Sequence, residues 1–199
     1  DSLDVLLLSV HGLIRGHDLE LGRDADTGGQ TKYVVELART LGAHPCVERV
    51  ELVTRRVVDL QVSPDYAAPT EDLGDGARIV RIACGEEGYV PKEELWDALD
   101  SFCDRTLAYL RSRDRLPDVI HSHYADAGYV GARLARQLGL PLVHTGHSLG
   151  RVKRRRLLAA GIRRDELERR YRISRRIEAE EDTLGMADLV ITSTRQEIE

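Results

Sequence analysis

The sequence predicts an α/β protein built on a doubly wound, mostly parallel β-sheet. Short apolar runs alternate with stretches of helical periodicity along the chain, which is the order that β-α-β units produce. The first run, residues 5–8, is apolar at every position, as expected for a strand that helices cover on both faces. Glycines and polar residues follow several runs directly, at the sheet edge where such folds bind ligands.

The first strand and the first helix are separated by a long loop. The strand at residues 5–8 ends near Val10, and residues 11–27 are rich in glycine and charge. Helical spacing starts after Gly28 and Gly29, and it is carried by Val34, Leu37, Ala38 and Leu41. A helix therefore begins beside the two glycines.

Two further strands and a second helix follow. Residues 50–54 and 78–83 are predicted to be strands, and the polar stretch between them, with Pro64 and Pro69, lacks a clear period and is predicted to be irregular. Residues 93–113 have one apolar face and end before a Leu-Pro pair, which is typical of a helix.

The last part of the chain continues the alternation. Strands are expected at residues 118–122, 142–145 and 189–193, and a helix at 128–138 with Gly139 as its C-cap. The stretch between the last two strands is expected to be helical and is heavily charged.

The composition indicates a single folded domain over residues 1–199. With 42% apolar residues the chain can form one sizeable core, and 29 Lys and Arg against 34 Asp and Glu argue against nucleic acid as a partner. No apolar run is long enough to span a bilayer, so no membrane partner is expected. The odd cysteine count, without C-x-x-C spacing, indicates reduced thiols and a cytoplasmic location.

Gly28 and Gly29 form the first candidate site. They precede a helix, so free backbone N–H groups and the positive end of the helix dipole would suit a phosphate oxygen there. The pattern is not G-x-G-x-x-G and the preceding loop is long, which disfavours NAD. Taken alone, the two glycines are equally consistent with a simple turn.

The histidines at the predicted strand ends are a second candidate. His121, His123, His144 and His147 lack the additional ligands at suitable spacing that a zinc site needs, so hydrogen-bonding roles are favoured over metal binding. No G-x-S-x-G elbow is present, which argues against a Ser-His-Asp hydrolase.

A basic stretch over residues 151–176 is the third candidate, with 12 basic residues against three acidic ones. A solvated helix face is the favoured interpretation for most of them. Arg175 and Arg176 flank an apolar helix side, so one of them could reach inward. Its partner there would be either a phosphate or one of the nearby glutamates, Glu178, Glu180 and Glu181.

Taken together, the motifs at the strand ends resemble those of the sucrose-phosphate synthase family over almost the whole chain. The matching segments are HGLIRG (11–16), ELGRDADTGGQTKYVVELA (20–38), LPDVIHSHYADAGYVGARLA (116–135), PLVHTGHSLGR (141–151), RRIEAEE (175–181) and ITSTRQEIE (191–199). The resemblance implies a retaining glycosyltransferase with two Rossmann-like domains in the GT-B arrangement. It also implies that this chain is the acceptor-side domain, and that the enzyme transfers glucose from UDP-glucose to fructose 6-phosphate.

The resemblance assigns roles to particular residues. Gly28 and Gly29 would approach the diphosphate of the donor, and Gln30 and Thr31 would line the acceptor site where sugar and nucleotide meet. His147 matches the family histidine near the anomeric carbon and would be catalytic.

The remaining matches concern the acceptor. Tyr124 and Ser148 would contact it, and Arg176, or its neighbour Arg175, would hold its phosphate. Where relatives often carry a phosphate-binding lysine, this sequence has Gly88. Either Lys92 or Lys153 would substitute for it, or the acceptor phosphate would be held by fewer contacts.

The resemblance further implies no tightly bound cofactor and no metal site, with magnesium at most as an activator. The donor-binding second domain lies outside these 199 residues, so the chain alone is expected to be inactive. Two alternatives stay open: a sucrose synthase-type enzyme that uses unphosphorylated fructose, and a non-catalytic module that binds sugar phosphates.

Overall fold

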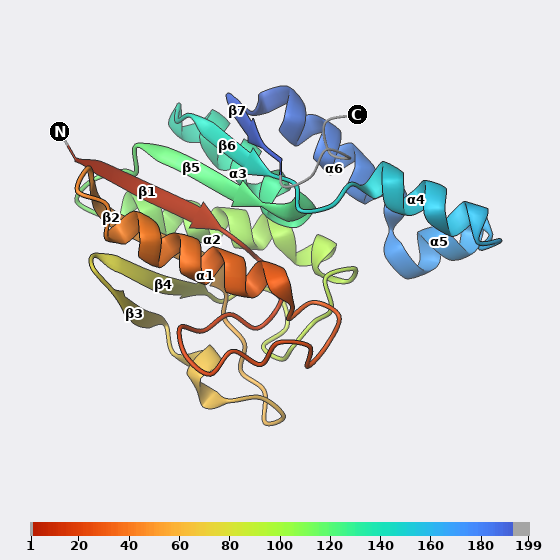
Figure 1. Cartoon of the computed structure of the whole chain (residues 1–199), viewed down its shortest axis with the longest axis horizontal. Coiled ribbons are helices and arrows are strands. Elements are labelled where there is room, and N and C mark those ends of the chain that lie inside the picture. The colour runs from red at the N-terminus through yellow and green to blue at the C-terminus, as the bar shows by residue number, and fades with distance from the viewer. Residues whose placement is uncertain (1, 193–199) are drawn as a thin grey trace.

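Strand β1 (Leu3–Leu8) lies in the middle of a seven-stranded sheet (Figure 1). The computed structural model describes residues 2–192. The strand order is β3-β4-β2-β1-β5-β6-β7, and every neighbouring pair is parallel except β3 and β4. The other strands are β2 (Val47–Arg55), β3 (Thr70–Gly74), β4 (Ala77–Ile82), β5 (Val119–His123), β6 (Leu142–Thr145) and β7 (Leu189–Ile191). The predicted doubly wound, mostly parallel sheet is confirmed.

Helices cover both faces of this sheet (Figure 1). The longer helices are α1 (Gly29–Gly42), α2 (Leu99–Arg111), α3 (Tyr124–Leu138), α4 (Gly150–Ala159), α5 (Arg164–Tyr171) and α6 (Ile173–Met186). Val5 and Leu7 of β1 pack in one cluster with α1, whereas Leu6 and Leu8 pack in another with α2 and α3. A strand covered on both sides must be apolar at successive positions, which explains the unbroken run in β1.

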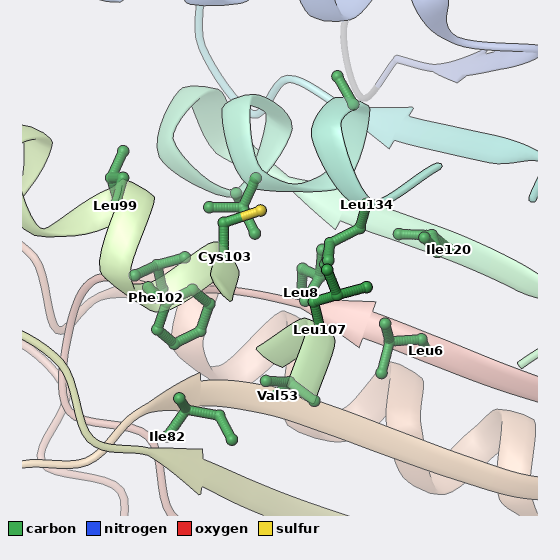
Figure 2. Packing of buried hydrophobic residues seen from close by; sticks show 14 of the residues in the cluster. Leu6, Leu8, Val53, Ile82, Leu99, Phe102, Cys103, Leu107, Ile120 and Leu134 are labelled. Atoms are coloured by element: carbon green, nitrogen blue, oxygen red, sulfur yellow. The ribbon is translucent and has the colours of Figure 1, made fainter. Parts of the chain in front are cut away.

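The larger of the two clusters contains the buried aromatic side chains of Trp96 and Phe102. Figure 2 shows Phe102 and Leu107 of α2 reaching toward Leu8 of β1 and Val53 of β2. Phe102 is fully buried, and the apolar area that such a ring removes from water is a large part of the driving force for folding. This core joins β1, β2, β5 and β6 to α2 and α3 on one face of the sheet.

The prediction that the chain between β2 and β4 is irregular is wrong in part. It contains a short 3₁₀ helix, η1 (Pro64–Ala67), and the antiparallel edge strand β3. Polar residues such as Glu71 and Asp72 are uncommon in strands, but an edge strand with solvent beside it tolerates them. The strand forms because the turn at Asp75 and Gly76, both with positive φ, returns the chain alongside β4.

The helix boundaries also differ from those predicted. The expected helix at 93–113 is a 3₁₀ turn, η2 (Leu95–Ala98), followed by α2. Helix α3 begins at Tyr124, directly after β5. Residues 124–127, which were predicted to lie between the strand and the helix, are therefore already helical. Gly139 ends α3 in the left-handed conformation, as predicted.

The charged stretch forms three helices, α4 to α6, of which α4 and α5 project from the sheet (Figure 1). Helix α6 returns along α3 and leads to β7. The predicted last strand is present over residues 189–191, and its expected end at Ser193 lies outside the described residues. None of the helices in residues 2–192 is long and apolar enough to cross a membrane.

Candidate functional site

A cleft of about 380 Å³ opens at the carboxyl ends of β1, β5 and β6. Side chains and backbone from six separate segments line it: His11, Ala25, Asp26, Gly28, Gly29, Gln30, Lys92, Tyr124, His147, Ser148, Lys153 and Arg176. This is the edge at which open α/β sheets bind their ligands. Most of its lining groups are polar or charged, so the cleft suits a hydrophilic ligand.

The start of helix α1 forms one wall of the cleft. Gly28 and Gly29 stand there, no side chain caps the helix, and the space beside both α-carbons is open. The first amides of a helix carry partial positive charge, so an anionic oxygen can approach the backbone here. Gln30 lies beside them, and its side-chain amide donates to the Ser9 hydroxyl at 3.3 Å.

Arg176 of α6 reaches into the cleft and is buried. Its Nε donates to Glu180 at 2.8 Å, and its Nη2 donates to the backbone oxygen and the hydroxyl of Ser148, each at 3.0 Å. The guanidinium also lies over the ring of Tyr124, 4.6 Å from its centroid. Among the described residues, Nη1 has no hydrogen-bond partner.

The two partners predicted for the inward arginine, a glutamate and a phosphate, are therefore not mutually exclusive for Arg176. Glu180 forms the internal salt bridge, and it also accepts from the Gly150 amide at 2.7 Å. Glu180 holds Nε and Ser148 holds Nη2, so Nη1 is the guanidinium nitrogen without a partner among the described residues. The salt bridge orients Arg176 and leaves it available to an anionic ligand.

Two lysines supply further positive charge. Lys92 pairs with Asp26, and Lys153 lies 3.6 Å from Glu93 and 4.0 Å from the ring centroid of Tyr171. Burial acts to raise the pKa of Asp26, but hydrogen bonds and charge from Lys92 outweigh it and leave that pKa below its usual value.

Gly88 stays away from the cleft, since its carbonyl oxygen accepts from Arg55 at 2.6 Å. The lysines named as substitutes at the sequence level, Lys92 and Lys153, both line the cleft.

A buried His11–Asp126 pair also borders the cleft. His11 Nδ1 lies 2.7 Å from Asp126 Oδ2, and the His11 ring meets the edge of the Tyr124 ring at a centroid distance of 4.7 Å. Neither His11 nor Asp126 was predicted from the sequence to be a site residue. The available signal was that both follow strands that the fold makes neighbours, β1 and β5.

Two of the five non-glycine residues with a positive φ in residues 2–192 line this cleft. Tyr124 has a φ of 76° and His147 a φ of 59°, in the left-handed region that non-glycine residues seldom adopt. Such conformations persist where the surrounding structure holds them, and they are common at functional sites.

Seven of the nine predicted site residues line the cleft: Gly28, Gly29, Gln30, Tyr124, His147, Ser148 and Arg176. Two do not. The hydroxyl of Thr31 donates to the Gly28 carbonyl at 2.7 Å and is buried against the helix, and Arg175 points away to Asp97 at 2.8 Å. Within residues 2–192, no group of three His, Cys, Asp or Glu side chains is placed to hold a metal ion.

The fold and the cleft define the class of protein. The family described as "Glycosyl transferase 4-like domain" matches residues 28–199, and the solved structures with this architecture are GT-B glycosyltransferases. The chain belongs to the glycosyl transferase 4-like family.

Sucrose-phosphate synthases are among the curated relatives of the chain. Sucrose-phosphate synthase 4 from Arabidopsis thaliana is 48% identical over 220 residues, which cover 100% of this chain and 21% of that protein. The sucrose-phosphate synthase from Zea mays is 48% identical over 223 residues, covering 99% of this chain and 21% of its own length. The chain thus spans about a fifth of the curated relatives that it matches.

Solved structures agree on the fold. Sucrose-phosphate synthase from Thermosynechococcus elongatus superposes with a TM-score of 0.77 at 28% identity, over 98% of this chain and 43% of that one. Os79 from O. sativa, solved in complex with UDP, has a TM-score of 0.57 at 17% identity, over 98% of this chain and 47% of that one.

Proposed function

We propose that this chain is the acceptor-side domain of a retaining glucosyltransferase that moves glucose from UDP-glucose to fructose 6-phosphate, giving sucrose 6-phosphate and UDP. The observation that carries the proposal is the convergence of Arg176, Lys92 and Lys153 on one cleft, beside Tyr124 and Ser148. Three cations around a hydrophilic cleft favour a phosphorylated sugar over a neutral one. The names of the curated relatives support the same substrate class.

The opposite wall of the cleft suits the donor. A diphosphate oxygen at the start of α1 would meet the amides that follow Gly28 and the positive end of the helix dipole. Os79 was solved with UDP, and UGT89C1 from Arabidopsis thaliana, which shares the fold, with UDP-L-rhamnose. Donor and acceptor would then meet between α1 and Arg176, where His147 lies.

The proposed reaction needs little acid–base chemistry from the protein. The bond between the anomeric carbon and the diphosphate oxygen breaks as the acceptor oxygen bonds to the same face of that carbon. The departing diphosphate oxygen takes the proton of the acceptor hydroxyl. The protein contributes by positioning the two substrates and by stabilising the charge that develops. Asp26, the carboxylate that lines the cleft, is held by Lys92, consistent with a reaction that uses no carboxylate nucleophile.

Titration calorimetry of this chain tests the acceptor assignment, with fructose 6-phosphate and fructose in parallel. We expect saturable binding of the phosphate sugar alone. Arg176→Ala should weaken it roughly tenfold or more, because a hydrogen bond to a charged group contributes about 1.5–3 kcal/mol. Arg175→Ala is the matched control, since that arginine pairs with Asp97 outside the cleft.

The other outcomes favour the alternatives. An equal response to fructose would favour the sucrose synthase-type enzyme. Binding of fructose 6-phosphate by a full-length relative that forms no sucrose 6-phosphate would favour the non-catalytic module. No binding of either sugar to this chain would contradict the acceptor site proposed here.

In this proposal, a second domain completes the binding of the donor that begins at α1. We propose that the diphosphate receives further cationic contacts from that domain, so residues 1–199 alone turn over negligibly. Comparing sucrose 6-phosphate formation by this chain and by a full-length relative tests this. Measurable turnover by the 199-residue chain would contradict it.

A further inference from the structure

Three imidazoles lie in a row, two from β5 and one from the segment that follows β6. His121 and His123 of β5 have ring centroids 4.1 Å apart, and the His147 ring follows at 5.3 Å from that of His123. Of these three, only His147 lines the cleft. The edge of Tyr33 in α1 packs against both His123 and His147, at centroid distances of 5.8 and 5.2 Å. The row therefore leads from the buried sheet to the candidate catalytic residue.

The buried imidazoles behind His147 are neutral at neutral pH. Burial, reinforced by the neighbouring histidines, lowers the pKa of His121 to about 4 and places that of His123 well below its usual range. A neutral imidazole has one N–H donor and one acceptor nitrogen. Which nitrogen carries the proton is therefore a structural property that its hydrogen bonds determine.

His123 Nδ1 lies 3.0 Å from His147 Nε2, so one of these nitrogens donates to the other. The second ring nitrogen of His123, Nε2, is buried and has no partner among the described residues. A proton on Nε2 would create a buried N–H without an acceptor, which native proteins rarely tolerate. A proton on Nδ1 is used in the contact with His147. The geometry thus selects His123 as the donor.

We propose that His123 is a positioning residue that donates its Nδ1–H to Nε2 of His147 and so holds His147 as the neutral tautomer with its proton on Nδ1. In this state, any hydrogen bond that the His147 ring makes outside the histidine row is donated from Nδ1. His147 then acts as a donor to oxygen atoms and does not take a proton from an acceptor hydroxyl through Nε2. The tautomer follows from the contacts of the free protein, whereas its part in glucosyl transfer rests on the function proposed above.

The contact between His123 and His147 also supports the backbone conformation of His147. A φ of 59° is costly for a histidine, so the residue needs contacts that hold it there. The hydrogen bond from His123 and the packing of Tyr33 provide them. His144 of β6 serves as a comparison because it is also buried but lies outside the histidine row. It pairs with Ser122, and the side chain of Ser122 faces the other side of the sheet from those of His121 and His123.

Long-range ¹H–¹⁵N spectra of the ¹⁵N-histidine-labelled chain, recorded at neutral pH without substrate, test the proposal. They report which ring nitrogens of each histidine are protonated, and the signals lost in His147→Gln assign that residue. We expect His147 to be protonated on Nδ1 only. In His123→Asn the side-chain amide can replace the donor, so the pattern should persist. In His123→Leu it should shift toward the Nε2–H form, and His144→Leu, the matched control, should leave it unchanged.

A proton on Nε2 of wild-type His147, or on both its nitrogens, would overturn the proposal, and so would an unchanged pattern in His123→Leu. The wild-type spectrum decides even if a variant does not fold. Because no substrate is present, the outcome is independent of the proposed reaction. An Nδ1–H His147 in a chain that binds no fructose 6-phosphate would contradict the proposed function and leave the tautomer assignment standing.

Discussion

The buried histidines predict that acid destabilises this protein before most carboxylates titrate. Burial lowers the pKa of His121 and of His144 to about 4, from about 6.5 in an unfolded chain. Between these values the unfolded state binds more protons than the folded state, so stability falls as the pH falls. At pH 5 each histidine is about 1.5 pH units below its unfolded pKa. At about 1.4 kcal/mol per unit, each then costs about 2 kcal/mol relative to neutral pH.

Such a loss is large against the 5–15 kcal/mol that typically stabilises a domain. Urea unfolding at pH 7 and pH 5 measures it, followed by the fluorescence of Trp96, the sole tryptophan, which is buried. Asp4 and Glu180, whose pKa values burial raises, oppose the trend, so the informative quantity is a difference between variants. His144→Leu should reduce the pH dependence of the unfolding free energy by about 2 kcal/mol. An identical pH dependence in the variant and the wild type would refute the reasoning.

Three further predictions concern stability. Glu180→Ala leaves Arg176 buried without its anion, which should cost about 3–5 kcal/mol in urea unfolding; the exposed neighbour variant Glu181→Ala should change stability by less than about 1 kcal/mol. Gly12→Ala places a Cβ 2.7 Å from a backbone oxygen at a φ of 81°, so calorimetry should show a lower Tm, and an unchanged Tm would mean that the loop relaxes freely. Phe102→Ala opens a cavity in the main core and should cost about 3–5 kcal/mol, whereas a loss below 1 kcal/mol would contradict the packing in Figure 2.

The regular elements were readable from the sequence because their signals are local. The unbroken apolar run in β1 exists because two separate clusters bury its alternate residues, and Gly139 ends α3 because its backbone needs a positive φ. Strand β3 escaped prediction because its residues are polar and its pairing with β4 comes from the chain reversal at Asp75 and Gly76.

The residues of the site, too, were only partly predictable from the sequence. The position of Gly28 and Gly29 at a strand end and before a helix was sufficient to place them at a ligand edge, since that follows from chain order. The helical pattern alone left the choice between Arg175 and Arg176 open, and only the family resemblance favoured Arg176. Adjacent residues on a helix differ by about 100° in direction, and the packing of α6 against α3 decides which one is inside.

The sequence by itself determined the class of fold, the edge of the sheet at which the cleft opens and most of the residues that line it. Only the tertiary structure decided which of them meet. His11 and Asp126 are 115 residues apart in the chain, and His123 and His147 are 24 apart, yet each pair is in hydrogen-bond contact. Local periodicity reports which face of an element is buried, whereas these contacts depend on strand order and register, which long-range packing sets.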